Sequence, residues 1–187
     1  MFFETYMTFG TGRIVVPELK YILLAMENDP FQNLSFFAGL SPAQLQVLRA
    51  VFVPCDMYVD TVLFEQGAPA EFLYIVVTGE VLVSFKPDDG PHLPVARVRM
   101  GGVVGWSAAL GSRKYTSAAI TTEYTQLLSV RGGDLRQIFR QYPTIGAIIK
   151  ERLADVIAQR TRVTHAQVKN LLDLGLTPVD MPKEAKR

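Results

Sequence analysis

The residues best suited to bind a ligand lie in a glycine-rich segment, residues 101–110, with the sequence GGVVGWSAAL. Glycine lets the backbone turn tightly and approach a ligand closely, and a helix that starts after such a turn points free N–H groups toward an anion. Ser107 adds a hydroxyl, and the small Ala108 keeps the wall of a pocket thin. The segment therefore contains residue types that a local anion site uses.

Catalytic and metal chemistry have little support in the sequence. The two histidines are separated, with His92 in a proline-rich loop and His165 in a helical segment, whereas a metal enzyme built on a β-barrel needs several clustered ligands. The single cysteine, Cys55, has no histidine close to it in the sequence that could act as a base. We expect no catalytic residue, no metal and no cofactor, and a buried structural role for Cys55.

The overall charge restricts the classes of partner. The 187 residues include 19 Lys and Arg and 18 Asp and Glu, so the net charge of +1 gives no general attraction for nucleic acid or anionic membranes. The longest apolar runs fall well short of the roughly 18–20 residues that a membrane span requires. The first residues, MFFETYMTFG, have no basic start and no continuous apolar region, so we do not expect them to act as a signal peptide. We therefore expect a cytoplasmic protein in which any anion site is local.

The elements that must position the glycine-rich segment follow from the apolar pattern. A helix is predicted to start at Pro42, with Ser41 as its N-cap. Between residues 51 and 131, short apolar stretches alternate with turn signals, which is typical of a β-sandwich or small barrel. The predicted strands are residues 51–53, 61–64, 72–77, 80–85, 95–98, 117–121 and 126–130.

A helical region is predicted to follow these strands. Asp134 is expected to cap a helix over residues 135–142, which Pro143 ends, and a longer helix is expected over residues 144–174. A further short helix is predicted around residues 17–26, packed against the body of the protein.

The long helix carries an apolar stripe at nearly the coiled-coil period. This pattern predicts a homodimer, and the interface residues expected are Ile149, Leu153, Val156 and Val163. Arg160 interrupts the stripe. We expect it either to pair with Glu151 or Asp155 of a partner helix or to extend into solvent.

Two segments resemble the cyclic nucleotide-binding domain family. Residues 63–81, LFEQGAPAEFLYIVVTGEV, resemble the front half of these domains, with Gly67 and Gly79 at the family's structural glycines. Residues 101–110 lie where the family carries its phosphate-binding cassette. Followed by Tyr115 and Thr116, the GWSA sequence is similar to that of a variant group of stand-alone bacterial members. In the family a glutamate at the hairpin position of Glu80 belongs to the fold, which implies a structural role.

The resemblance implies a mainly β fold with flanking helices, a double-stranded β-helix of the jelly-roll type with about eight strands, followed by a long C-terminal helix. The chain then divides into four parts: an N-terminal helical extension (1–30), the β-roll with its leading helix (31–143), the dimerisation helix (144–175) and a flexible tail (176–187).

Two positions differ from the pattern of cyclic AMP binders in this family. Trp106 replaces the glutamate that holds the ribose 2′-hydroxyl, and Thr116 replaces the arginine that clamps the phosphate. Threonine cannot supply the charged, bidentate grip of arginine, so the usual cyclic AMP contacts are missing. Trp106 could stack on a ligand or plug the cassette. The expected ligand-binding residues are Gly105, Trp106, Ser107, Ala108, Thr116 and Ser117.

Two functional hypotheses follow. In the first, a non-catalytic sensor module binds a nucleotide or another small anion at residues 105–110, and binding repositions the helices from Asp134 onward. In the second, the pocket is degenerate and the chain is a scaffold for a protein partner. About 25 residues follow Arg162, too few for the helix-turn-helix that the family's DNA-binding regulators carry, so direct DNA binding is not expected.

Overall fold

The structure is a computed structural model that describes residues 6–9, 12–15, 29–87 and 92–175; the side chains of residues 6–15 and 161–175 are outside this description. Strands β1 (Tyr6–Phe9) and β2 (Gly12–Val15) pair in antiparallel fashion. The sequence predicts a helical extension over residues 1–30, whereas these two segments are strands. The helix predicted around residues 17–26 lies outside the described residues.

Three short helical segments precede the β-roll. These are α2 (Pro30–Asn33), the 3-10 turn η1 (Ser35–Phe37) and α3 (Pro42–Arg49). Ser41 caps α3 as predicted: its Oγ accepts a hydrogen bond from the Gln44 N–H, and the Gln44 side chain accepts one from the Ser41 N–H. The predicted start of this helix is thus confirmed.

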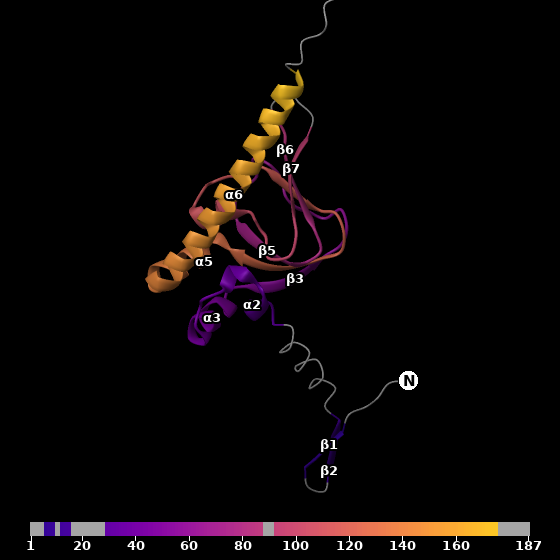
Figure 1. Ribbon diagram of the computed structural model, residues 1–187. Helices are drawn as coiled ribbons and strands as arrows, with labels where there is room; N and C mark the ends of the chain where they lie inside the picture. Colours follow the sequence, from indigo (N-terminus) through magenta and orange to yellow (C-terminus); the bar gives the residue numbers. More distant parts are fainter. Residues whose placement is uncertain (1–5, 10–11, 16–28, 88–91, 176–187) are drawn as a thin grey trace, which may run out of the picture.

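Eight strands of the described region form two antiparallel four-stranded sheets (Figure 1). One sheet has the order β3-β10-β5-β8 and the other has the order β4-β9-β6-β7. This is the roll with flanking helices that the sequence predicted. The strand bounds are β3 (Val53–Met57), β4 (Val62–Phe64), β5 (Phe72–Thr78), β6 (Val81–Phe85), β7 (Leu93–Val98), β8 (Val103–Val104), β9 (Ala118–Thr121) and β10 (Thr125–Arg131).

Strand β5 separates two hydrophobic cores. Leu73 and Ile75 contribute to a core shared with the helices, whereas Tyr74 and Val76 contribute to the core inside the roll. Successive side chains of a strand point to opposite faces, so an apolar strand with no polar face can serve both cores. The strand thereby fixes the position of the helices relative to the interior of the roll.

Three helices complete the described fold: α4 (Trp106–Leu110), α5 (Gly132–Gln141) and α6 (Pro143–Gly175). Asp134 is predicted to be the N-cap of α5, but the N-cap is Arg131 and Asp134 lies in the first turn of the helix. A carboxylate in the first turn interacts favourably with the helix dipole. Pro143 ends the preceding helix as expected and also begins α6, a position at which its missing N–H costs no hydrogen bond. Helix α6 starts beside α5 and runs along one side of the roll (Figure 1).

The buried stripe of α6 packs within its own chain. Ile145, Ile149 and Leu153 are at most 2 % exposed and belong to the core shared with the leading helices and α5. The prediction that Ile149 and Leu153 contact a partner helix is therefore corrected, because the intrachain core already covers them. Val156 is half-buried against the same core, and the side chain of Val163 is outside the description.

Candidate ligand pocket

Gly105 fixes the start of helix α4. Its φ is +76°, a conformation that L side chains rarely adopt, and a Cβ atom there would lie 2.5 Å from the carbonyl oxygen of Phe72. The glycine-rich segment therefore needs this glycine for two reasons, backbone conformation and close approach to β5. Together they hold the first turn of α4 against the neighbouring strand.

Tyr115 ties the loop after α4 to the same strand. The Phe72 N–H donates to the Tyr115 hydroxyl, which in turn donates to the Phe72 carbonyl oxygen, both at 2.8 Å. The Tyr115 ring stacks on Phe64 with centroids 3.9 Å apart. Burial raises the pKa of Tyr115, so the hydroxyl stays protonated and keeps both hydrogen bonds at neutral pH. Thr116 and Ser117 follow Tyr115 directly, so the contacts of Tyr115 also fix their position.

A small pocket lies between α4, the Tyr115 loop and α6. Its volume is about 10 Å³, which is close to the space that one water molecule needs. Its polar side chains include the hydroxyls of Ser107, Thr116 and Ser117 and the guanidinium of Arg160, while the Tyr115 hydroxyl is bonded to Phe72. The full lining is Phe64, Val83, Val104, Gly105, Trp106, Ser107, Tyr115, Thr116, Ser117 and Arg160.

The structure brings together five of the six predicted ligand-binding residues; the exception is Ala108. Ala108 is fully buried, and its carbonyl oxygen accepts a hydrogen bond from the Arg136 guanidinium. A Cβ atom on Gly132 would lie 2.2 Å from the same carbonyl oxygen. Ala108 therefore serves the close contact between α4 and α5 and does not line the pocket.

Arg160 lines the pocket, although it is expected from the sequence to face a partner helix or solvent. Its Cζ lies 4.4 Å from the centroid of the Trp106 ring, and its Nη2 donates to the Val103 carbonyl oxygen at 3.0 Å. Desolvation by burial lowers the pKa of Arg160 to about 10, so it remains charged at neutral pH. Arg160 thus turns toward the roll of its own chain, contrary to the expectation of a partner carboxylate or solvent.

The contact with Arg160 also bears on the two alternatives for Trp106. The indole is half-buried and packs against the helix-side core, and the guanidinium of α6 lies over its ring. A cation over an indole ring is attracted by the negative charge on its face. The ring that could stack on a ligand therefore stacks on a side chain of the same protein.

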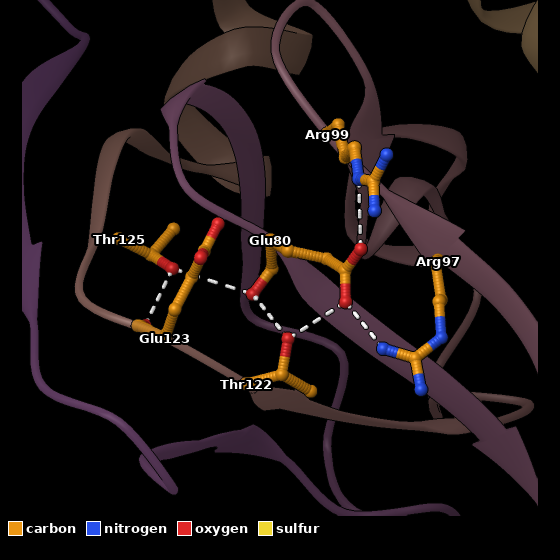
Figure 2. A network of polar contacts seen from close by, with 6 residues as sticks. All are labelled: Glu80, Arg97, Arg99, Thr122, Glu123 and Thr125. Atoms are coloured by element: carbon orange, nitrogen blue, oxygen red, sulfur yellow. Dashed lines mark hydrogen bonds and ion pairs between the residues drawn. The ribbon is translucent and has the colours of Figure 1, made fainter.

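A second polar cluster surrounds Glu80, at the turn between β5 and β6 (Figure 2). The Glu80 carboxylate accepts hydrogen bonds from Arg97 Nη1 at 2.5 Å, Arg99 Nε at 2.8 Å and Thr122 Oγ1 at 2.8 Å. The hydrogen bonds from Thr122, Arg97 and Arg99 lower the pKa of Glu80 to about 2. Because this cluster connects the β5–β6 turn to β7 and to the β9–β10 turn, it supports the structural role predicted for Glu80.

The remaining chemical groups are dispersed. Within the described ranges, no three His, Cys, Asp or Glu side chains lie close enough to hold a metal ion. Cys55 is half-buried, not fully buried as expected, and packs against the roll core, where desolvation raises the pKa of its thiol. In the same part of the chain, no helix is long and apolar enough to cross a membrane.

Comparisons with known proteins agree with this fold. The family model described as "Cyclic nucleotide-binding domain" matches residues 59–142. A putative cyclic nucleotide-binding protein from Geobacter metallireducens superimposes with a TM-score of 0.63 at 21% identity, covering 72% of this chain and 97% of that one. A cyclic nucleotide-binding domain from Methylobacillus flagellatus gives a TM-score of 0.65 at 20% identity, covering 82% and 85%.

Among curated proteins, the chain is 27% identical over 143 residues to a CRP-like cAMP-activated global transcriptional regulator of Mycobacterium tuberculosis. The match covers 76% of this chain and 61% of the regulator, so the chain spans about six-tenths of that relative. The Cyclic AMP receptor protein of Thermus thermophilus is 25% identical over 156 residues, covering 76% and 72%. On the family match, the fold and these regulatory relatives, residues 59–142 form a domain of the cyclic nucleotide-binding domain family.

Proposed function

We propose that this chain is a non-catalytic regulatory module that binds a small anion in the pocket beside Gly105 and passes the bound state on to α6. The observation that carries this proposal is the position of Arg160, which lines the pocket although it belongs to α6. A ligand that contacts Arg160 acts on the helix directly. Binding and the position of α6 are therefore coupled through one side chain.

The groups in the pocket favour an anion. Ser107, Thr116 and Ser117 offer hydroxyl donors, and Arg160 offers the charged donor that the cassette lacks at Thr116. Arginine recognises phosphate or carboxylate oxygens through two parallel hydrogen bonds. Arg160 thus supplies, from α6, the type of group that the family's cyclic AMP binders carry at the position of Thr116.

The size of the pocket provides the link to conformational change. A volume of about 10 Å³ does not admit a phosphate group, still less a nucleotide, while Trp106 and Arg160 remain in contact. We propose that an anion makes room by drawing Arg160 away from the Trp106 ring. Such a ligand prefers the state in which this contact is open, and that differential affinity shifts the population of α6 positions.

Two contacts can transmit the change to the helices. The first is Arg160 itself. The second is the close approach of Gly132 to the Ala108 carbonyl oxygen, through which a movement of α4 acts on the first turn of α5. Helix α5 in turn packs on α6. We propose that the receiver is a second copy of the chain, contacted through α6, with the half-buried Val156 and with Val163 as candidate contacts.

The small pocket also favours a second candidate function. If the contact between Trp106 and Arg160 never opens, the cassette is permanently filled by the protein's own side chains, and the chain is a scaffold for a protein partner. This candidate predicts that no anion stabilises the fold.

A ligand titration with two readouts tests the proposal. Purified protein is titrated with cyclic AMP, cyclic GMP, cyclic dinucleotides, inorganic phosphate and sulfate, and both the thermal midpoint and the tryptophan emission are recorded. Trp106 is the only tryptophan of the chain, so its emission reports on the pocket. A ligand at 100 times its Kd stabilises the folded state by about 2.7 kcal/mol, which raises the midpoint measurably.

Variants identify the site of any response. Arg160→Met is expected to abolish both changes, whereas Arg140→Met, which removes an exposed arginine at the end of α5, is expected to leave them intact. Substitutions of Gly105 do not suit this purpose, because any side chain there meets the Phe72 carbonyl oxygen and disturbs the fold. A response that survives in Arg160→Met places the ligand elsewhere. If no ligand produces a response, the anion function is wrong and the scaffold remains.

A further inference from the structure

Two turns lie side by side at one end of the roll, and a buried threonine joins them. The turn between β3 and β4 contains residues 58–61, and the turn between β9 and β10 contains residues 122–124. Thr121 is fully buried; its Oγ1 donates to the Tyr58 carbonyl oxygen at 2.6 Å and accepts from the Thr61 N–H at 2.9 Å. The Asp60 N–H donates to the Thr121 carbonyl oxygen at 2.9 Å. These bonds make the two turns one rigid unit.

This unit presents large side chains to solvent. Tyr58 is 77 % exposed, Val59 is 55 % exposed and Tyr124 is 52 % exposed. The two tyrosine rings contact each other edge to face, with centroids 6.1 Å apart. Tyr58, Val59 and Tyr124 belong to neither hydrophobic core. A single exposed apolar residue is ordinary, but an ordered aromatic pair on rigid turns is the type of surface that dominates protein–protein binding energies.

The charges around the pair have one sign. Asp56, Asp60 and Glu123 are exposed on the same two turns and the adjoining end of β3. The sequence has no lysine or arginine within residues 50–85 or within residues 115–130. We name the surface formed by Asp56, Tyr58, Val59, Asp60, Glu123 and Tyr124 the tyrosine end.

Two arginines approach from β7 and its end, but they are bound to another group. Arg97 and Arg99 both contact the Glu80 carboxylate. In Figure 2 these arginines lie on one side of Glu80, and the Glu123 side chain lies on the other. Their charges are therefore directed to Glu80, and the tyrosine end keeps its negative character.

We propose that the tyrosine end is a docking surface for an arginine-bearing segment of a partner protein. Guanidinium groups stack on tyrosine rings and pair with carboxylates, so a single type of side chain satisfies both features of this surface. Lysine forms the ion pairs but stacks less well, because its ammonium group is compact and strongly hydrated. The surface is rigid before binding, which reduces the entropy cost of association.

Fluorescence anisotropy with a defined probe tests this inference on the full chain. The probe is a fluorescein-labelled peptide of four Gly-Arg repeats, used at physiological salt, and the comparison peptide has four Gly-Lys repeats. The wild-type protein is expected to bind the arginine peptide saturably and more tightly than the lysine peptide. Tyr58→Ser combined with Tyr124→Ser is expected to weaken binding about tenfold or more.

Matched variants distinguish docking at the tyrosine end from non-specific electrostatic attraction of the cationic peptide. Asp60→Asn removes one charge while keeping a residue that tolerates the φ of +62° at this position, and it is expected to weaken binding severalfold. Tyr142→Ser, at an exposed tyrosine that is the C-cap of α5, is expected to have no effect. Absence of saturable binding to the wild type would overturn the proposal, as would equal affinities in the double tyrosine variant and the Tyr142 variant. The result is independent of the anion pocket, so Arg160→Met is expected to bind the peptide normally.

Discussion

Two regions of this molecule use arginine in opposite ways. At Glu80, two exposed guanidiniums pair with one carboxylate that is only 7 % exposed. At the cassette, Arg160 is turned inward onto the Trp106 ring and the Val103 carbonyl oxygen, neither of which carries a charge. Removal of one member of the Glu80 ion pairs leaves a buried charge uncompensated, whereas the contacts of Arg160 with the Trp106 ring and the Val103 carbonyl oxygen are contacts with neutral groups. We expect the Glu80 ion pairs to be fixed, and we propose that the contact between Arg160 and Trp106 is the one that a ligand exchanges.

If Arg160 is an exchangeable contact, the apolar side chains of α6 must hold the helix on the roll. Leu153→Ala is expected to lower the free energy of unfolding by about 2–5 kcal/mol, because it leaves a cavity in a core where Leu153 is fully buried. Urea denaturation measures this, with Leu153→Met as the volume-conserving control. The loss is expected to be the same at two protein concentrations. A loss that depends on concentration would mean that Leu153 also contributes to a contact between copies.

Loss of the Glu80 carboxylate is expected to have the next largest effect. Glu80→Gln removes the charge that Arg97 and Arg99 share, and it is expected to lower the thermal midpoint by several degrees at pH 7. Glu123→Gln is the matched control, since that exposed carboxylate lies on the neighbouring turn. Equal midpoints for the two variants would contradict a fixed structural role for Glu80.

The same comparison has a pH dependence. The pKa of Glu80 is lowered from 4.5 to about 2, so the folded state binds its proton less readily than the unfolded state. This stabilisation is fully present above pH 4.5 and is lost as the pH falls toward 2. The difference in midpoint between wild type and Glu80→Gln is therefore expected to shrink over that window. A difference that stays constant down to pH 2 would show that ionisation of Glu80 does not contribute.

The smallest expected change in stability is that of Arg160→Leu. A cation over an indole ring stabilises by about 0.5–2 kcal/mol, and leucine restores part of the packing, so the loss is expected to stay near or below 1 kcal/mol. The emission spectrum of Trp106 is nevertheless expected to change, because the group over its ring is replaced. A loss as large as that of Leu153→Ala would show that Arg160 is a fixed anchor, and the contrast between the two arginine sites would fail.

Local signals made much of the fold predictable. Ser41 and Pro42 marked the start of α3, and the apolar run of residues 72–77 marked the strand that serves both cores. Gly105 marked the turn of the cassette, because its φ of +76° favours a residue without a side chain. In each of these cases the physical cause lies within a few residues of the signal.

The errors concern contacts between distant elements. An apolar stripe such as that of Ile149 and Leu153 fits a partner helix or the core of its own chain equally well, and only the three-dimensional arrangement decides between them. The spacing of the stripe also gave no indication that Arg160 would meet Trp106. Similarly, the small size of Ala108 suited a pocket wall and a helix contact alike, and the position of Gly132 determined the outcome.

Helix α6 is 33 residues long, or roughly 50 Å at 1.5 Å per residue. Arg160 lies near its middle, with the buried side chains on one side and about 22 Å of helix on the other. If an anion acts on Arg160 as proposed, the helix pivots close to the pocket. A tilt of about 10° about that point displaces the far end by roughly 4 Å, more than the reach of a hydrogen bond. Rearrangement of a single side chain could in this way become a displacement that another molecule can detect.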